Sequence, residues 1–406
     1  MKLVYYVWEY PPRLVGGLGT YAAEITKKFA EQGHEVYVFT MNDDHSLPTN
    51  EDMGKGIHVH RPMVADASNV IPVFVDDELK RWGTGIKFFS DVLTYNMLAA
   101  NKFLNDTARD VKADVVVSHD WLGAMAGMIT KQNSKLPFIQ HFHSTEYGRS
   151  GGSGSSTVKG LEYAAAQQAD MLITVSYAMR EELNTLRYPA PKTRVAWNGV
   201  DEKKWSMKNY TKAQVEAYRG NLGIKPDDKM MLFTGRLTWV KGIDSLIRAM
   251  PAILAKEPKA KLVVLGRGEM YEELKALTSQ LGISESVIFV NKWVDEQDRL
   301  MLYASSDIVC APSRYEPFGI VCLEGMALEK PVLVGYGGLR EAVIEGQQGL
   351  YCDPNNPQNI ADQALKLLTN PDTIKRYGKN GRKRVEEYFT WDKIAADTIS
   401  LYETLL

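Results

Sequence analysis

The chain has 406 residues, with 48 Lys and Arg against 50 Asp and Glu, a formal net charge of −2 and 45% hydrophobic residues. This composition is that of an ordinary globular protein of about two to three domains, and it excludes disordered, collagen-like and coiled-coil chains. A near-neutral chain also lacks the excess of clustered cations that nucleic-acid binding requires.

The N-terminal half alternates short apolar runs with longer segments of helical periodicity. The run at residues 3–8 is too short for a signal-peptide core and predicts a buried first strand. A glycine-rich turn follows it, and then a helix with Tyr21, Ile25 and Phe29 on one face. Because continuous apolar strands between helices indicate a parallel sheet covered on both faces, residues 1–200 are predicted to form one doubly wound domain. Its later strands are predicted at residues 36–40, 114–118, 137–142, 171–175 and 194–197.

The second half repeats this pattern after a polar connector at residues 203–222. The two patterns together predict an α/β chain of two Rossmann-like doubly wound domains, with two or three helices at the C-terminus. The strands of the second domain are predicted at residues 229–234, 261–265, 287–290, 308–311 and 331–334. A Ser/Gly-rich stretch at residues 150–156 favours a mobile loop over a domain linker, with the hypothesis that it orders over a substrate.

Membrane and redox signals are both weak. No window approaches the roughly 18 apolar residues that would cross a bilayer, so no membrane span is expected and the expected location is the cytoplasm. The three cysteines, Cys310, Cys322 and Cys352, contain no CxxC pair and provide no disulfide framework.

Candidate ligand-binding residues of the first domain lie where predicted strands end, which is where open α/β sheets bind ligands. Gly16 and Gly17 follow the first strand, and their small size lets backbone N–H groups approach a phosphate, although a tight turn alone also explains them. Asp120 and His143 follow two other strands, and a purely structural histidine is the alternative there. The spacing of histidines and cysteines forms no zinc motif, so no catalytic metal is predicted.

Candidate residues of the second domain include cations and carboxylates. Arg236 and Lys241 flank a predicted helix start at the end of a strand, which suits a diphosphate, although two surface cations are the plainer alternative. Glu316 and Glu324 are separated by a turn and a helix start. The intervening backbone amides would face an anion while the carboxylates accept from sugar hydroxyls. Two solvated glutamates are a weaker explanation, because Glu324 interrupts an apolar stretch.

In order along nearly the whole chain, these motifs resemble the retaining GT-B glycosyltransferases of family four and their glycogen and starch synthase relatives. The resemblance implies two Rossmann-like domains, residues 1–200 and 201–388, facing across an interdomain cleft, with residues 389–406 packing back on the N-terminal domain. Members transfer a hexose from a nucleotide sugar with retention of configuration and without a required metal. The motifs that carry the resemblance are Trp8-Glu9-Tyr10-Pro11-Pro12 with Val15-Gly16-Gly17-Leu18, His119-Asp120-Trp121, His143, Asn198-Gly199-Val200-Asp201, Gly235-Arg236 with Lys241-Gly242, Glu316-Pro317-Phe318-Gly319 through Glu324, and Gly337-Gly338-Leu339-Arg340-Glu341.

The resemblance also implies a role for each candidate residue. The catalytic set would be Arg236 and Lys241 on the donor diphosphate, Glu316 on the donor-sugar hydroxyls, and His143 in the sugar pocket. Glu9 would face the acceptor. The remaining donor contacts would be the ribose contact of Glu324, the pocket residue Asp120, and backbone groups of Gly16, Gly17, Gly319, Ile320 and Val321.

We therefore expect an enzyme that transfers glucose from UDP- or ADP-glucose to an α-glucan with no cofactor. Two other functions within the same fold stay open: hexose transfer to a small or lipid-linked acceptor, and epimerisation of a nucleotide sugar. A non-catalytic sugar-nucleotide sensor is a third. The expected partners are the nucleotide sugar and a glucan or other sugar acceptor, with no nucleic acid; whether the chain forms a homo-oligomer stays open.

Overall fold

The computed structural model describes residues 1–14, 16–42, 45–83, 85–292 and 294–406, and the chain divides into two units. Unit 1 comprises Met1–Trp197 together with Trp391–Leu406, and unit 2 comprises Asn198–Thr390. Each unit is built on its own sheet of mainly parallel strands with helices connecting them, which confirms the predicted pair of Rossmann-like folds. Within the described residues, no helix combines the length and apolar character needed to cross a membrane.

Unit 1 contains an eight-stranded sheet in the order β3-β4-β2-β1-β5-β6-β7-β8, which is parallel except for the antiparallel edge pair β3–β4. Six of the strands match the predicted ones, whereas β3 and β4 were not predicted. The strands are β1 (Lys2–Tyr6), β2 (Glu35–Phe39), β3 (Asn50–Asp52), β4 (Ile57–His60), β5 (Val115–His119), β6 (Phe138–Phe142), β7 (Met171–Thr174) and β8 (Thr193–Val195).

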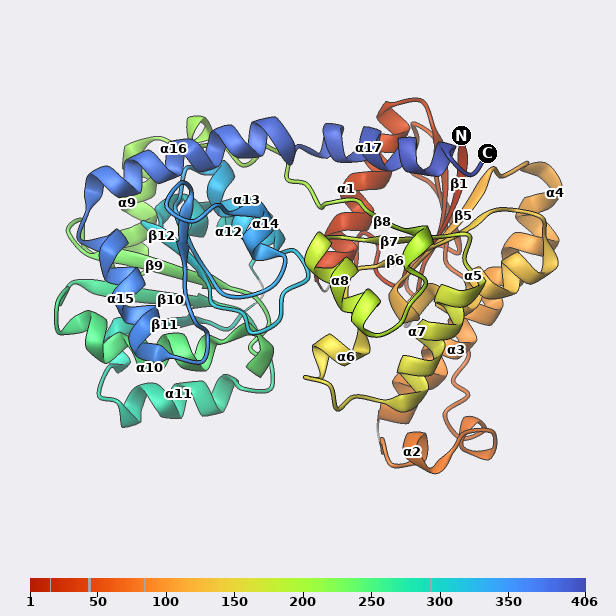
Figure 1. Ribbon diagram of the computed structural model, residues 1–406, viewed down its shortest axis with the longest axis horizontal. Coiled ribbons are helices and arrows are strands. Elements are labelled where there is room, and N and C mark those ends of the chain that lie inside the picture. Colours follow the sequence, from red (N-terminus) through yellow and green to blue (C-terminus); the bar gives the residue numbers. More distant parts are fainter. Residues whose placement is uncertain (15, 43–44, 84, 293) are drawn as a thin grey trace. The chain divides into compact units, whose positions relative to one another are not determined.

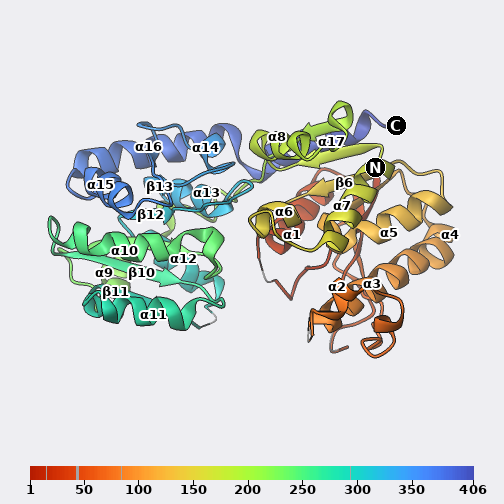
Figure 2. The same ribbon diagram turned by 60° about the horizontal axis from the view of Figure 1, so that its bottom comes forward.

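The helices of unit 1 bury one apolar face each. In α1 the predicted face of Tyr21, Ile25 and Phe29 is fully buried. Helices α3, α5 and α7 pack side by side (Figure 2), and the C-terminal helix α17 packs along α1 (Figure 1). The bounds are α1 (Gly17–Glu31), α2 (Asp77–Lys80), α3 (Gly85–Lys102), α4 (Ala108–Asp110), α5 (Asp120–Asn133), α6 (Glu146–Arg149), α7 (Ser156–Gln168), α8 (Tyr177–Thr185) and α17 (Trp391–Glu403).

Helix α17 belongs to the core of unit 1 although it lies at the far end of the chain. Its Trp391 and Ile394 are buried in the same apolar cluster as β1. The hydroxyls of Tyr402 and Tyr5 lie 2.5 Å apart inside that cluster. The C-terminal residues therefore complete the N-terminal unit.

Unit 2 contains a six-stranded, wholly parallel sheet in the order β11-β10-β9-β12-β13-β14. Its strands are β9 (Lys229–Thr234), β10 (Ala260–Leu265), β11 (Val287–Val290), β12 (Ile308–Ala311), β13 (Val332–Val334) and β14 (Gly349–Tyr351), of which β14 was not predicted. Helices α10 and α15 lie side by side, as do α13 and α16 (Figure 1). The helices are α9 (Lys212–Asn221), α10 (Ile243–Leu254), α11 (Tyr271–Gln280), α12 (Glu296–Ser305), α13 (Ile320–Ala327), α14 (Leu339–Ala342), α15 (Pro357–Leu368) and α16 (Pro371–Tyr388).

Both sheets reverse their strand order beside their first strand. In unit 1 the chain runs from β1 outward to β2 and β4 and then returns to place β5 on the other side of β1. In unit 2 it runs from β9 to β10 and β11 and returns to place β12 beside β9. Ligands of open α/β sheets bind at such switch points, beyond the carboxyl ends of the strands. A ligand is therefore expected at the loops after β1, β5, β9 and β12.

Candidate active site

At the switch point of unit 1, Asp120 holds the backbone of the loop that carries His143. Asp120 is the first residue of α5, directly after β5, and its φ of +50° is a left-handed conformation that residues other than glycine seldom adopt. Its Oδ1 accepts hydrogen bonds from the backbone N–H groups of His143, at 2.6 Å, and Ser144, at 3.2 Å. Burial raises the pKa of Asp120, and Arg149 and these N–H groups oppose that shift. The structure thus brings the two predicted pocket residues together.

A polar network lies behind this loop. Arg149 donates one hydrogen bond to Ser144, at 2.5 Å, and another to Glu162, at 3.1 Å. Glu162 is 1% exposed, and its burial raises its pKa to about 8 against the opposing charge of Arg149. Its carboxylate also accepts from the backbone N–H of Glu146. The loop after β6 is therefore anchored by hydrogen bonds along most of its length.

Three histidines meet beside Asp120. His119, His141 and His143 place ligand nitrogens within 4.8 Å of one another, and they are the group of the described residues able to hold a metal ion. Burial lowers the pKa of all three, to about 3 for His143, so the rings are neutral, as metal ligation requires. His119 and His143 are hydrogen-bonded to each other, however, with 3.1 Å between Nδ1 and Nε2. The expectation of a metal-free enzyme stays a prediction.

The glycine turn after β1 lies next to Glu9. Gly16 is the N-cap of α1, Gly17 is its first residue, and both are exposed. The Oε2 of Glu9 accepts a hydrogen bond from the backbone N–H of Gly16, at 2.9 Å. The residue predicted to face the acceptor therefore lies directly beside the amides predicted to approach the donor phosphates.

At the switch point of unit 2, a lysine and a glutamate from distant parts of the chain form an ion pair. Lys241 ends the short helical turn Trp239–Lys241 after β9, and Glu316 lies in the loop after β12. Their Nζ and Oε2 atoms are 2.5 Å apart, and Ser313 donates to the same Oε2 at 3.4 Å. Arg236, in the loop that follows β9, is exposed, and its side chain has no hydrogen-bond or ion-pair partner among the described residues.

Close backbone contacts hold this pair in place. Gly242, directly after Lys241, has φ +68°, and a Cβ there would lie 1.9 Å from the carbonyl oxygen of Pro312. A Cβ on Gly338 would lie 1.9 Å from the carbonyl oxygen of Pro317, next to Glu316. Neither position can carry a side chain without moving the backbone, so the two glycines let the Lys241 and Glu316 loops pack tightly.

The N-terminus of helix α13 lies next to Glu316. Gly319 is its N-cap in a left-handed conformation, and Ile320 and Val321 form the first turn. The first N–H groups of a helix have no partner within it, and with the helix dipole they favour an anion. The backbone groups predicted to contact the donor thus lie three to five residues from Glu316, in the second predicted half of the site.

Glu324 lies further along α13 and is 2% exposed. Its Oε1 pairs with Arg299 at 2.8 Å, and the buried hydroxyl of Tyr303 faces the same carboxylate. Burial raises the pKa of Glu324, and Arg299 opposes that shift. The Tyr303 hydroxyl opposes it as well, and the ribose contact of Glu324 stays a prediction.

Comparison with known proteins decides the family. A family model described as "Glycosyltransferase Family 4" matches residues 15–204, and one described as "Glycosyl transferases group 1" matches residues 214–384. An uncharacterised glycosyltransferase of Methanocaldococcus jannaschii is 34% identical over 99% of this chain and 98% of its own length. The chain belongs to the family 4 glycosyltransferases.

Two further proteins show the range of this glycosyltransferase's relatives. A glycogen synthase of Mycobacterium tuberculosis is 29% identical over 99% of this chain and 94% of its own. The solved structure of a sucrose-phosphate synthase from Thermosynechococcus elongatus has the same fold, with a TM-score of 0.80 at 23% identity, and the match covers 100% of this chain and 98% of the other.

Motifs alone did not reveal every residue of the glycosyltransferase's two half-sites. Arg299, which neutralises Glu324 and lies 4.9 Å over the ring of Trp205, has no glycine or strand-end signal near it. The motif His119-Asp120-Trp121 predicts no separate role for His119. These residues act through partners far away in the sequence, so no local spacing marks them.

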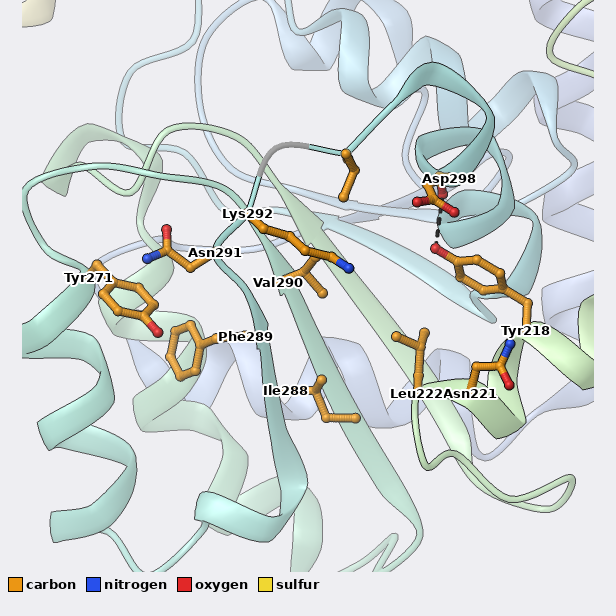
Figure 3. Close-up of a pocket in the computed structure, with 11 residues that line it drawn as sticks. Tyr218, Asn221, Leu222, Tyr271, Ile288, Phe289, Val290, Asn291, Lys292 and Asp298 are labelled. Carbon is orange, nitrogen blue, oxygen red and sulfur yellow. Dashed lines mark hydrogen bonds between the residues drawn. The ribbon is translucent and has the colours of Figure 1, made fainter.

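A separate pocket of about 650 Å³ lies at the edge strand β11 of unit 2. Figure 3 shows Tyr271 and Phe289 on one side and Tyr218 on the other, with the hydroxyl of Tyr218 donating to the backbone oxygen of Asp298. Its lining contains none of the predicted site residues. The predicted site residues of the glycosyltransferase therefore lie at the switch points and outside this pocket.

Proposed function

We propose that this glycosyltransferase transfers glucose from UDP- or ADP-glucose to an α-glucan, with retention of configuration and without a metal. The observation that carries the proposal is the Lys241–Glu316 pair at the switch point of unit 2, beside the N-terminus of α13. A cation that would bind phosphate and a carboxylate that would accept from sugar hydroxyls lie side by side there. The match to a glycogen synthase along 99% of the chain supports the glucan acceptor.

In the proposed reaction, the bond between the sugar C1 and the phosphate oxygen breaks while C1 bonds to an acceptor hydroxyl oxygen on the same face. The acceptor proton passes to the departing phosphate oxygen, so the protein needs no strong base. Lys241, Arg236 and the amides of Ile320 and Val321 would stabilise the charge that develops on the diphosphate, which is the kind of contribution that dominates catalysis.

The other candidate residues would position the substrates. Glu316 would accept hydrogen bonds from the donor sugar, and Glu324 would accept one from the ribose. His143, with Asp120 behind it, would contact the sugar from unit 1. Glu9 would lie on the acceptor side.

A matrix of donors and acceptors tests this proposal. Purified full-length protein is incubated with UDP-glucose or ADP-glucose, each with glycogen, with maltooligosaccharides, with sugar phosphates, or alone. We expect release of UDP or ADP that depends on glucan, together with chains lengthened by residues that an α-specific glucosidase removes. Residues resistant to that enzyme would refute retention.

The same matrix separates the alternatives. Nucleotide release only with sugar phosphates would replace the glucan by a small acceptor. A new nucleotide sugar formed from the donor alone would establish epimerisation. Tight donor binding without product in every arm would indicate a sensor. Each of these three outcomes contradicts glucan synthesis.

A further inference from the structure

Two histidines on neighbouring strands of unit 1 share a single hydrogen bond. His119 ends β5, and His143 directly follows β6. The Nδ1 of His119 lies 3.1 Å from the Nε2 of His143. His119 is fully buried, whereas His143 is only partly buried. Burial lowers the pKa of both rings, so each is neutral and carries one ring proton.

A hydrogen bond between two neutral imidazoles requires one nitrogen to donate and the other to accept. If His143 donated from Nε2, the proton of His119 would have to sit on its own Nε2. That atom is buried and has no partner among the described residues, so the ring would hold an unsatisfied N–H. Buried N–H groups without an acceptor are rarer and costlier than unsatisfied acceptors.

The opposite arrangement avoids this cost. With its proton on Nδ1, His119 donates to Nε2 of His143, and only an acceptor nitrogen of His119 is left unpaired. His143 then carries its proton on Nδ1. That atom has no partner within the described residues and belongs to the histidine of the pair that solvent can reach.

We infer that His119 is a positioning residue that fixes His143 in the tautomer with the proton on Nδ1, so that His143 presents an N–H donor to its ligand. The neighbouring residue, Asp120, holds the backbone N–H of His143 at 2.6 Å. Two consecutive residues at the end of β5 therefore fix both the backbone and the ring of His143.

The consequence for catalysis rests on the proposed function. A ring fixed as a donor can bind an oxygen of the donor sugar but cannot remove a proton from a hydroxyl. This matches a reaction in which the leaving phosphate takes the acceptor proton. His143 would thus orient the sugar and would not act as a general base.

The tautomer can be measured without any substrate, so this test is independent of the proposed function. Full-length protein labelled with ¹⁵N at histidine is examined by long-range ¹H–¹⁵N correlation, and His143 and His119 are assigned from single variants. We expect both rings to be neutral at pH 7 with the proton on Nδ1. A protonated Nε2 on His143, a charged ring, or exchange between the two tautomers would each overturn the inference.

Kinetic variants test the positioning role. His119→Asn keeps an amide N–H near the place of the imidazole Nδ1–H, whereas His119→Leu removes it. In the glycosyltransfer assay we expect His119→Leu to lower kcat on the order of 10- to 100-fold with an unchanged KM for the acceptor, and His119→Asn to restore most of it. Equal losses in the two variants would contradict the hydrogen-bonding role.

His141 provides a matched control. It is also fully buried, and its Nε2 is also unpaired, but it stacks on His143 with 4.3 Å between the ring centroids, and its Nδ1 is hydrogen-bonded to the hydroxyl of Tyr21. His141→Leu removes a buried imidazole of the same cluster and leaves the His119–His143 bond intact. We expect its kcat to fall much less than that of His119→Leu. An equal fall would assign the effect to packing and overturn the inference.

Discussion

Asp120 offers the most direct test of how the loop carrying His143 is held. Asp120→Ala removes two hydrogen bonds from backbone N–H groups to a carboxylate, at 2.6 and 3.2 Å, and leaves alanine at a φ of +50°. Hydrogen bonds to charged groups contribute about 1.5–3 kcal/mol each. Alanine in a left-handed conformation costs about 1–2 kcal/mol more.

These contributions do not simply add. Burial raises the pKa of Asp120, which means that the folded protein already carries a cost for desolvating the carboxylate, and alanine removes that cost. We therefore expect Asp120→Ala to lower the local opening free energy of the segment after β6 by about 3 kcal/mol. Asp120→Asn keeps the oxygen acceptor and tolerates the left-handed backbone, so about 1 kcal/mol is expected for it.

Hydrogen exchange followed by mass spectrometry measures the opening free energy of each segment separately. It therefore suits a chain of two units better than a single melting curve. A loss of 3 kcal/mol corresponds to roughly 10²-fold faster exchange of peptides covering Phe138–Phe142 and the loop after it. Peptides from Lys229–Thr234 in unit 2 are the internal control and should not change. Wild-type protection in Asp120→Ala would refute the anchoring role. An equal loss in Asp120→Asn would show that the charge, and not the acceptor geometry, holds the loop.

Three other predictions follow from the site. Lys241→Ala and Glu316→Ala should each lower the transfer rate by about 10²–10³ while the fold is kept, whereas Lys259→Ala, which breaks an exposed ion pair, should leave it unchanged in the same assay. Treatment with EDTA should leave the rate unchanged; a loss restored by added metal would contradict metal independence. Burial lowers the pKa of His60 to about 4, below its ordinary value, so the unfolded state binds more protons than the folded state between about pH 6.5 and 4. The stabilising contribution is complete above this range and is lost as the pH falls, by at most about 1.4 kcal/mol per pH unit. Urea unfolding at pH 7, 6 and 5 should show that the free energy of unfolding falls less steeply with falling pH in His60→Gln than in the wild type. Equal pH dependence in the two proteins would contradict the role of His60.

The fold class could be predicted because the central strands are buried on both faces. Strands β1, β5 and β9 each contain a run of at least three consecutive apolar residues, and apolar runs between helices are typical of a parallel sheet. Of the three strands that were not predicted, β3 and β14 lie at sheet edges, where less burial is required, and β4 lies next to the edge strand β3. Asn50–Asp52 contains no apolar residue, and Gly349–Tyr351 has only three residues. An edge strand can be held by backbone pairing alone, which leaves little trace in hydrophobic periodicity.

The contacts within the candidate site, unlike the fold class, could not be predicted from the sequence. Motifs placed single residues at strand ends, but the partners that fix their charge and orientation are distant in the chain. Lys241 and Glu316 are 75 residues apart, and His119 and His143 are 24 apart. Only the return of β12 beside β9, and the pairing of β6 with β5, brings them together. Spacing along the chain carries no information about such pairs, so their contacts required the structure.

The adjacency of Lys241 and Glu316 limits what chemistry unit 2 can support. Transfer from a sugar diphosphate breaks the bond between a neutral sugar and a charged phosphate, so the group that holds the sugar and the group that stabilises the phosphate must lie within a few ångströms of each other. A carboxylate accepts well from hydroxyls but repels phosphate, and an ammonium does the reverse. Placed 2.5 Å apart, each offsets the other's charge, and Ser313 adds a donor to the same carboxylate oxygen. A site for a free phosphate would gain nothing from Glu316, whereas the oxygens of a sugar diphosphate offer partners to both Lys241 and Glu316. Their pairing therefore favours a ligand in which sugar and phosphate are joined.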